Sequence, residues 1–247
     1  MCYDPDQVRV SSPVPNGLAL IFDLDGVVID SMPMHLAAWE SYLDRLGIKH
    51  SDFGPKMHGR RNDDIVAEFI GGGLSSEKIF AHGAAKEALF REMMTSQIER
   101  HILPGLKNFL YSCAPAPIGL ATNAEPANVD FVLDGAGLRE HFQVIVDGHQ
   151  VERPKPFPDV YLRAARLLGI DPKNCIVFED SPTGIAAARA AGTHVVGIGQ
   201  DAAALPKVDL LIRDFTIRES GGGGSDGGGS DGGSALEQWL RTVELQS

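Results

Sequence analysis

Two acidic side chains follow a short apolar run near the start of this 247-residue chain. Leu18 to Phe22 are apolar, and Asp23 and Asp25 come directly after them, followed by Gly26. A turn at a glycine can aim two such side chains into one pocket. Neighbouring carboxylates that face a cation can then divide the work, one attacking phosphorus and the other donating and recovering a proton. Turn capping is the plain structural alternative, while an EF-hand calcium loop needs its glycine two positions later.

Three later segments place further polar residues at the ends of apolar runs. Thr122 ends the run in IGLATNA, Lys155 lies in RPKPFPDVY, and Glu179 and Asp180 end the run in IVFED. Taken singly, each has an ordinary interpretation. They would be a strand-end hydroxyl, a solvated loop lysine, and an N-cap for a helix that begins near Pro182.

Taken together, these segments resemble, in order, the four motifs of haloacid dehalogenase-type phosphotransferases. The first is FDLDGVVIDS, from Phe22 to Ser31. The resemblance implies that Asp23 is the nucleophile and Asp25 the general acid and base. It also implies that the transferring phosphoryl group is bound by Thr122, Asn123 and Lys155.

The same resemblance implies a magnesium cofactor. Its ligands would be the carboxylates of Asp23, Glu179 and Asp180 and the main-chain carbonyl of Asp25. Hard oxygen donors of this kind suit Mg²⁺. A phosphoryl group in transfer carries dispersed negative charge, so positioned cations are the main catalytic requirement.

The interval 31–101 contains helical patterns and no convincing strand. Leu36, Trp39, Leu43 and Leu46 repeat at helical spacing, for example. We expect a helical insertion, which resembles the cap of the subfamily I group containing β-phosphoglucomutase and many sugar-phosphate phosphatases. That resemblance implies substrate-binding roles for residues of the insertion, namely His35, Gly59, Arg60, Arg61, Asn62 and Lys86.

Some positions depart from the mutase pattern. The mutase's cap arginine aligns with Asn62, and its small polar residues after the second motif align with Ala124 and Pro126. These departures bear on the second phosphate site, which a mutase needs and a phosphatase does not, although Arg60 or Arg61 could compensate. His35 has an alternative role as a packing residue on the first cap helix.

The elements that must position these residues are β-strands separated by helices. Besides the first run, apolar runs occur at 116–121, 142–146, 174–178, 194–198 and 209–212. Alternation with helical stretches predicts an α/β fold with a doubly wound, Rossmann-like parallel sheet. We expect an N-terminal tail (1–17), a core domain (18–30 and 102–247) and a helical cap (31–101). Within the core domain, a glycine-rich tether at 220–234 precedes a C-terminal helix at 235–245 that docks back on the core.

Composition limits the function classes. The net charge of -11 argues against a general nucleic-acid binder, which needs clustered Lys and Arg. Three widely spaced cysteines indicate neither a disulfide framework nor a zinc site, which favours a reducing cytoplasm. No apolar run approaches membrane-spanning length, and no oligomerisation element is evident, so we expect a monomer without membrane partners.

The leading hypothesis is a Mg²⁺-dependent phosphatase that hydrolyses a small phosphomonoester, most simply a sugar phosphate, through an aspartyl-phosphate at Asp23. The first alternative is a hexose-phosphate mutase resembling β-phosphoglucomutase, in which a sugar hydroxyl rather than water accepts the phosphoryl group. The second is a non-catalytic metabolite-binding protein on the same fold. A binding protein would have no need of the proton-transfer residue Asp25.

Overall fold

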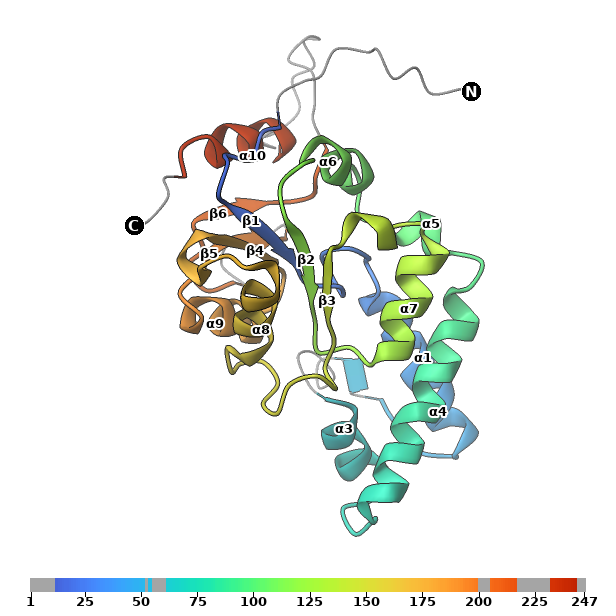
Figure 1. Cartoon of the computed structure of the whole chain (residues 1–247). Helices are drawn as coiled ribbons and strands as arrows, with labels where there is room; N and C mark the ends of the chain where they lie inside the picture. The colour runs from blue at the N-terminus through green and yellow to red at the C-terminus, as the bar shows by residue number, and fades with distance from the viewer. Residues whose placement is uncertain (1–11, 52, 55–60, 200–204, 217–231, 244–247) are drawn as a thin grey trace.

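The computed structural model describes residues 12–51, 53–54, 61–199, 205–216 and 232–243. Within them, six parallel strands form one sheet in the order β3-β2-β1-β4-β5-β6 (Figure 1). The strands are β1 (Ala19–Phe22), β2 (Ile118–Ala121), β3 (Val144–Val146), β4 (Cys175–Glu179), β5 (His194–Ile198) and β6 (Leu210–Ile212). The chain continues from β1 toward one edge of the sheet and from β4 toward the other edge, so the strand order reverses between β1 and β4. Ligands bind at such switch points. The predicted doubly wound α/β fold is confirmed.

Helices cover both faces of the sheet. One face packs against α6 (Leu106–Ser112), α7 (Pro126–Gly135) and α10 (Gly232–Leu240), and the other against α8 (Asp159–Leu168) and α9 (Pro182–Ala190). Two short 3-10 turns, Arg139–His141 and Pro172–Asn174, complete the core. Side chains of β1 alternate between the two cores, since Phe22 packs into the first and Ile21 into the second. Strands buried on both faces are apolar throughout, which is why the sequence pattern predicts them.

The inserted segment forms a helical cap, as predicted. Its helices are α1 (Met32–Arg45), α3 (Asn62–Phe69), α4 (Ser76–Met94) and α5 (Ile98–His101). The cap has a small core of its own, built from Trp39, Leu43, Phe53, Ile65 and Val66. The long helix α4 also inserts Phe90 and Met94 into the main core, so it joins the cap to the sheet domain.

The two chain segments that connect the cap to the core lie side by side. Ile29 pairs with Ile102 in an antiparallel bridge, and the Asp30 N–H donates to the His101 carbonyl at 2.7 Å. The His101 ring also contacts the Asp30 carbonyl, through Nδ1 at 2.8 Å. We propose that the cap boundaries lie here, at residues 31 and 101.

The C-terminal helix packs on the core, and its bounds, Gly232 and Leu240, both lie earlier in the chain than the expected 235 and 245. Helix α10 starts at Gly232, inside the segment assigned to the tether, and the rest of the expected tether, up to residue 231, lies outside the described residues. Leu236 and Leu240 are fully buried in the main core. These two leucines give the helical signal, whereas the first turn is made of Gly and Ser, which carry none.

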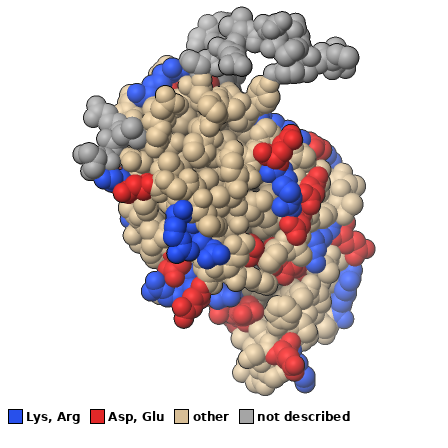
Figure 2. Space-filling model, in the orientation of Figure 1, with Lys and Arg blue, Asp and Glu red and all other residues tan. Residues whose placement is uncertain are grey.

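No helix in the described part of the chain combines the length and the apolar composition needed to cross a bilayer. Figure 2 shows acidic and basic side chains interspersed on the face that is in view.

Candidate active site

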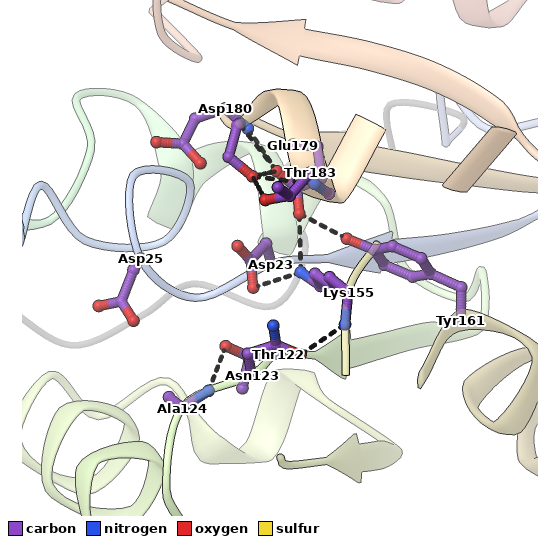
Figure 3. Close-up of polar contacts among 12 residues, drawn as sticks. Asp23, Asp25, Thr122, Asn123, Ala124, Lys155, Tyr161, Glu179, Asp180 and Thr183 are labelled. Atoms are coloured by element: carbon purple, nitrogen blue, oxygen red, sulfur yellow. Dashed lines mark hydrogen bonds and ion pairs between the residues drawn. The ribbon is translucent and has the colours of Figure 1, made fainter. Parts of the chain in front are cut away.

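The polar residues predicted to carry chemistry meet at the carboxyl edge of the sheet (Figure 3). Asp23 follows β1, Thr122 follows β2, Glu179 is the last residue of β4, and Asp180 comes next. Strands β2 and β4 both pair with β1, with Phe22 opposite Leu120 and Phe178. The register therefore brings the three strand ends to one level, with Asp23 in the middle.

Lys155 supplies a buried positive charge to this cluster. Its Nζ lies 2.9 Å from Asp23 Oδ1 and 2.7 Å from Glu179 Oε1. Burial alone would lower the pKa of Lys155, but the charges of Asp23 and Glu179 outweigh it and raise that pKa, so the ammonium stays ionised. The ammonium also lies over the ring of Tyr161, 4.8 Å from its centroid. Lys155 is thus held as a fixed cation beside the predicted nucleophile.

Glu179 is fully buried and held by donors on both oxygens. Oε1 accepts from Lys155 and from the Tyr161 hydroxyl, at 2.7 and 2.8 Å. Oε2 accepts from the Asp180 and Ser181 N–H groups, each at 2.9 Å, and from the Ser181 hydroxyl at 3.0 Å. A Cβ at Gly184 would lie 1.6 Å from Oε1, so the first turn of α9 can approach only because residue 184 is glycine. The carboxylate is therefore fixed in place, and much of its acceptor capacity is used.

Asp23, Glu179 and Asp180 form an acidic cluster. Each offers an oxygen, and these atoms all lie within 4.8 Å of one another. Burial, opposed by Lys155 and reinforced by Glu179, raises the pKa of Asp23 to about 7. Burial together with the charges of Glu179 and Asp23 raises the pKa of Asp180 to about 8. One lysine does not offset three carboxylates, so the cluster is short of positive charge.

The donor set fits a hard divalent cation. Asp23 Oδ1 is buried. Lys155 Nζ lies 2.9 Å from it as an ion pair, but no described residue donates a well-aligned hydrogen bond to it. Gly26, at φ +77°, passes so close that a Cβ there would lie 1.9 Å from Asp180 Oδ2. Carboxylate oxygens grouped in this way are the ligands that such cations prefer. Participation of the Asp25 carbonyl stays a prediction.

The Asp25 side chain lies apart from the acidic cluster, on the loop between β1 and the cap, as Figure 3 shows. Its Oδ1 accepts from the Ser31 hydroxyl at 2.5 Å and lies 3.5 Å from Nε2 of His35. Desolvation would raise the pKa of Asp25, but the His35 contact, the Ser31 hydrogen bond and the charge of Lys86 together lower it. Asp25 is therefore a carboxylate in the free site and can accept a proton there.

Thr122 and Asn123 occupy the turn after β2. The buried Thr122 hydroxyl oxygen accepts from the Ala124 N–H at 3.1 Å, which leaves its own proton available to an acceptor in the site. Asn123 Oδ1 accepts a hydrogen bond from the main-chain N–H of Lys155 at 3.1 Å. Asn123 thus ties the lysine loop to β2, a structural role beside the predicted contact with substrate.

A cavity of about 340 Å³ opens over these residues and reaches the cap. On the cap side it is lined by His35, Asn62, Lys86 and, at its mouth, the exposed Arg61. His35 stacks on Phe90 with 3.9 Å between ring centroids, so it both packs and faces Asp25. Lys86 is buried, with Nζ 2.8 Å from His35 Nδ1. Two further predicted residues, Gly59 and Arg60, lie outside the described residues.

Comparison with known proteins identifies the family. A profile of the haloacid dehalogenase-like hydrolases matches residues 18–192. The chain belongs to this family. Within the haloacid dehalogenase-like hydrolases, it is similar to a fructose-1-phosphate phosphatase of Escherichia coli (strain K12), with 32% identity over 72% of this chain and 95% of that protein.

Other relatives of this haloacid dehalogenase-like hydrolase are phosphomutases. A β-phosphoglucomutase of Bacillus subtilis (strain 168) is 30% identical over 79% of this chain and 88% of that protein. The crystal structure of a β-phosphoglucomutase from Clostridium difficile superimposes with a TM-score of 0.70 at 28% identity, covering 79% of this chain and 90% of that one. The chain is accordingly a phosphatase or phosphomutase of this family.

Several polar residues at the site were not among those expected from the sequence. They are Ser31 beside Asp25, Tyr161 and Ser181 around Glu179, and Glu87 and Asn128 on the cap side of the cavity. Tyr161 offers a weak signal, because it follows Lys155 by six residues in RPKPFPDVY. Glu87 offers none, because a Lys-Glu pair on a helix is typical of a solvated surface and only tertiary contacts bury it.

Proposed function

We propose that this haloacid dehalogenase-like hydrolase is a Mg²⁺-dependent phosphatase that acts on a small sugar phosphate. The observation that carries the proposal is the group of Asp23, Lys155 and Asp180 at the base of a cavity that Asp25 also lines. A nucleophilic carboxylate, a fixed cation and a separate proton carrier are what phosphoryl transfer through an enzyme ester requires.

In the first half-reaction, Asp23 attacks phosphorus and the sugar oxygen leaves. Lys155 and the Thr122 hydroxyl contact the phosphoryl oxygens, over which the negative charge is spread. Protonated Asp25 donates its proton to the leaving oxygen, so an alcohol departs and an aspartyl-phosphate remains on Asp23. The arriving phosphate dianion favours the protonated form of Asp25, because like charges oppose ionisation.

In the second half-reaction, the Asp25 carboxylate takes a proton from water as that water attacks the aspartyl-phosphate. Phosphate leaves and Asp23 is regenerated. The site for Mg²⁺ would be made by Asp23 and Asp180, with Glu179 and the Asp25 carbonyl completing it. When bound there, the ion supplies positive charge that screens the nucleophile from the phosphate dianion.

The second candidate is a hexose-phosphate mutase, which the β-phosphoglucomutase relatives favour. It would use the same aspartyl-phosphate but pass the phosphoryl group to a sugar hydroxyl. A water-excluding closed cap would decide between the two acceptors. We place the phosphatase first because Asn62 occupies the position where the mutase resemblance calls for an arginine.

Two assays test the proposal. Turnover of p-nitrophenyl phosphate with and without Mg²⁺ tests for catalysis, and absence of metal-dependent turnover would favour a binding protein. β-Glucose 1-phosphate with a trace of the bisphosphate primer then separates the enzymes. Free phosphate as product supports the phosphatase, whereas glucose 6-phosphate supports the mutase.

The small phosphorylated substrate is the only partner in this proposal. We also propose that the enzyme works as a monomer in a reducing cytoplasm. Cys113 and Cys175 are both buried as free thiols, which is compatible with that compartment.

A further inference from the structure

The cap side of the cavity contains a buried carboxylate. Glu87, on α4, is only 5% exposed and lies beside Lys86, which is 2% exposed. Both line the cavity that reaches down to Asp23. A buried carboxylate at this end is unexpected in a site that binds anions, because it repels any second negative group on the substrate.

Three neighbouring side chains hold Glu87 in place. Its Oε1 accepts from Lys86 Nζ at 2.8 Å and from the amide of Asn62 at 2.6 Å. Its Oε2 accepts from the amide of Asn128, on α7 of the core domain, at 2.8 Å. Burial would raise the pKa of Glu87, but Lys86, His35 and Asn62 lower it, so the group is ionised. The negative charge is thus a fixed part of the cavity wall.

The positive charge of the buried Lys86 is offset by the carboxylate of Glu87. Lys86 forms its ion pair with Glu87 at 2.8 Å, and Glu87 Oε2 also lies 3.7 Å from His35. A second carboxylate of the wall, Glu125, is paired with Arg91, which does not line the cavity. Among the described residues, Arg61 is the only lysine or arginine on the cap side of the cavity that has no ion pair, and it is exposed.

We infer that Glu87 is a specificity residue that restricts the enzyme to monophosphates whose remaining part is neutral and hydroxylated. The inference rests on the proposed phosphatase function, since it assumes that the reacting phosphate lies against Asp23 and Lys155. The rest of the substrate then faces Glu87, Asn62 and Asn128. Hydroxyl groups find carboxylate and amide partners there, whereas a second phosphate meets a like charge.

The test compares matched substrates. Fructose 1-phosphate with fructose 1,6-bisphosphate, and glucose 1-phosphate with glucose 1,6-bisphosphate, differ only in the second phosphate. We expect the wild-type kcat/KM to be at least tenfold higher for each monophosphate. Glu87→Gln, which removes the charge and keeps the shape, should reduce this preference about tenfold. Glu87→Asp, which keeps the charge, and Glu92→Gln, on an exposed position of α4, should leave it unchanged.

The outcomes are separable. Equal wild-type rates on mono- and bisphosphate would overturn the inference without any variant, and so would an unchanged preference in Glu87→Gln with wild-type melting behaviour. Hydrolysis of p-nitrophenyl phosphate is measured alongside. If that hydrolysis proceeds while the preference is absent, the specificity inference fails and the phosphatase stands. If no phosphate ester is hydrolysed at all, the proposed function fails first.

Discussion

The acidic cluster predicts that Asp23→Asn stabilises the metal-free protein in a pH-dependent way. Asp23 titrates near pH 7 in the folded protein and at 3.8 in its unperturbed state, because burial and Glu179 disfavour its charge. A carboxyl whose pKa is raised by folding adds stability below the unfolded value, and that stability is lost as the pH rises to the folded value. The free energy of unfolding should therefore fall between about pH 4 and pH 7.

The size of the effect follows from the shift. Each unit of pKa shift corresponds to about 1.4 kcal/mol. The shift of Asp23 from 3.8 to about 7 therefore means that ionising Asp23 costs the folded state at most about 4 kcal/mol. Asparagine has no charge to bury. We expect Asp23→Asn to raise the free energy of unfolding by about 2 to 4 kcal/mol at pH 8 and by much less at pH 5, where wild-type Asp23 is still protonated.

Urea unfolding in the presence of a chelator, at pH 5 and pH 8, measures this difference. Added Mg²⁺ should stabilise the wild type at pH 8 and should stabilise Asp23→Asn less, since one ligand has lost its charge. A substitution that is destabilising at pH 8, or equally stabilising at both pH values, would refute the reasoning. Glu92→Gln, at an exposed carboxyl on α4, controls for general charge effects.

Two further predictions concern the groups that hold Glu179. Gly184→Ala would place a methyl group 1.6 Å from Glu179 Oε1. We therefore expect kcat/KM to fall at least a hundredfold and Mg²⁺ affinity to weaken. Wild-type activity in a folded Gly184→Ala variant would contradict this packing. Tyr161→Phe removes one donor to Glu179, and we expect a loss of about 1 kcal/mol in stability and of threefold to tenfold in kcat, measured by urea unfolding and steady-state kinetics. A Tyr161→Phe variant without measurable turnover would contradict this supporting role and show that the hydroxyl has a direct catalytic role.

The core of the site could be predicted from the sequence because its residues sit at fixed points of the fold. Asp23, Thr122 and Glu179 each end a strand or directly follow one, and the carboxyl ends of parallel strands meet at one edge. The apolar runs that predict the strands therefore also predict that these side chains converge. Their catalytic and metal-binding roles stay predictions until the variants are measured.

The cap side could not be predicted in the same way. Glu87 and Asn128 are 41 positions apart on different helices, and their hydrogen bond depends on how α4 packs against α7. A helical pattern shows which face is apolar but not which polar residue at its border becomes buried. For the same reason, the sequence indicated Lys86 as a substrate ligand without its partner Glu87.

The central claim is that Asp23 forms a covalent bond to phosphate. Acid quenching during turnover of the preferred substrate, followed by borohydride reduction, converts a phosphorylated aspartate to homoserine, which mass spectrometry locates in the sequence. The account predicts homoserine at position 23 only when Mg²⁺ and substrate are both present. Steady turnover with homoserine at position 25, or at no carboxyl group, would contradict it.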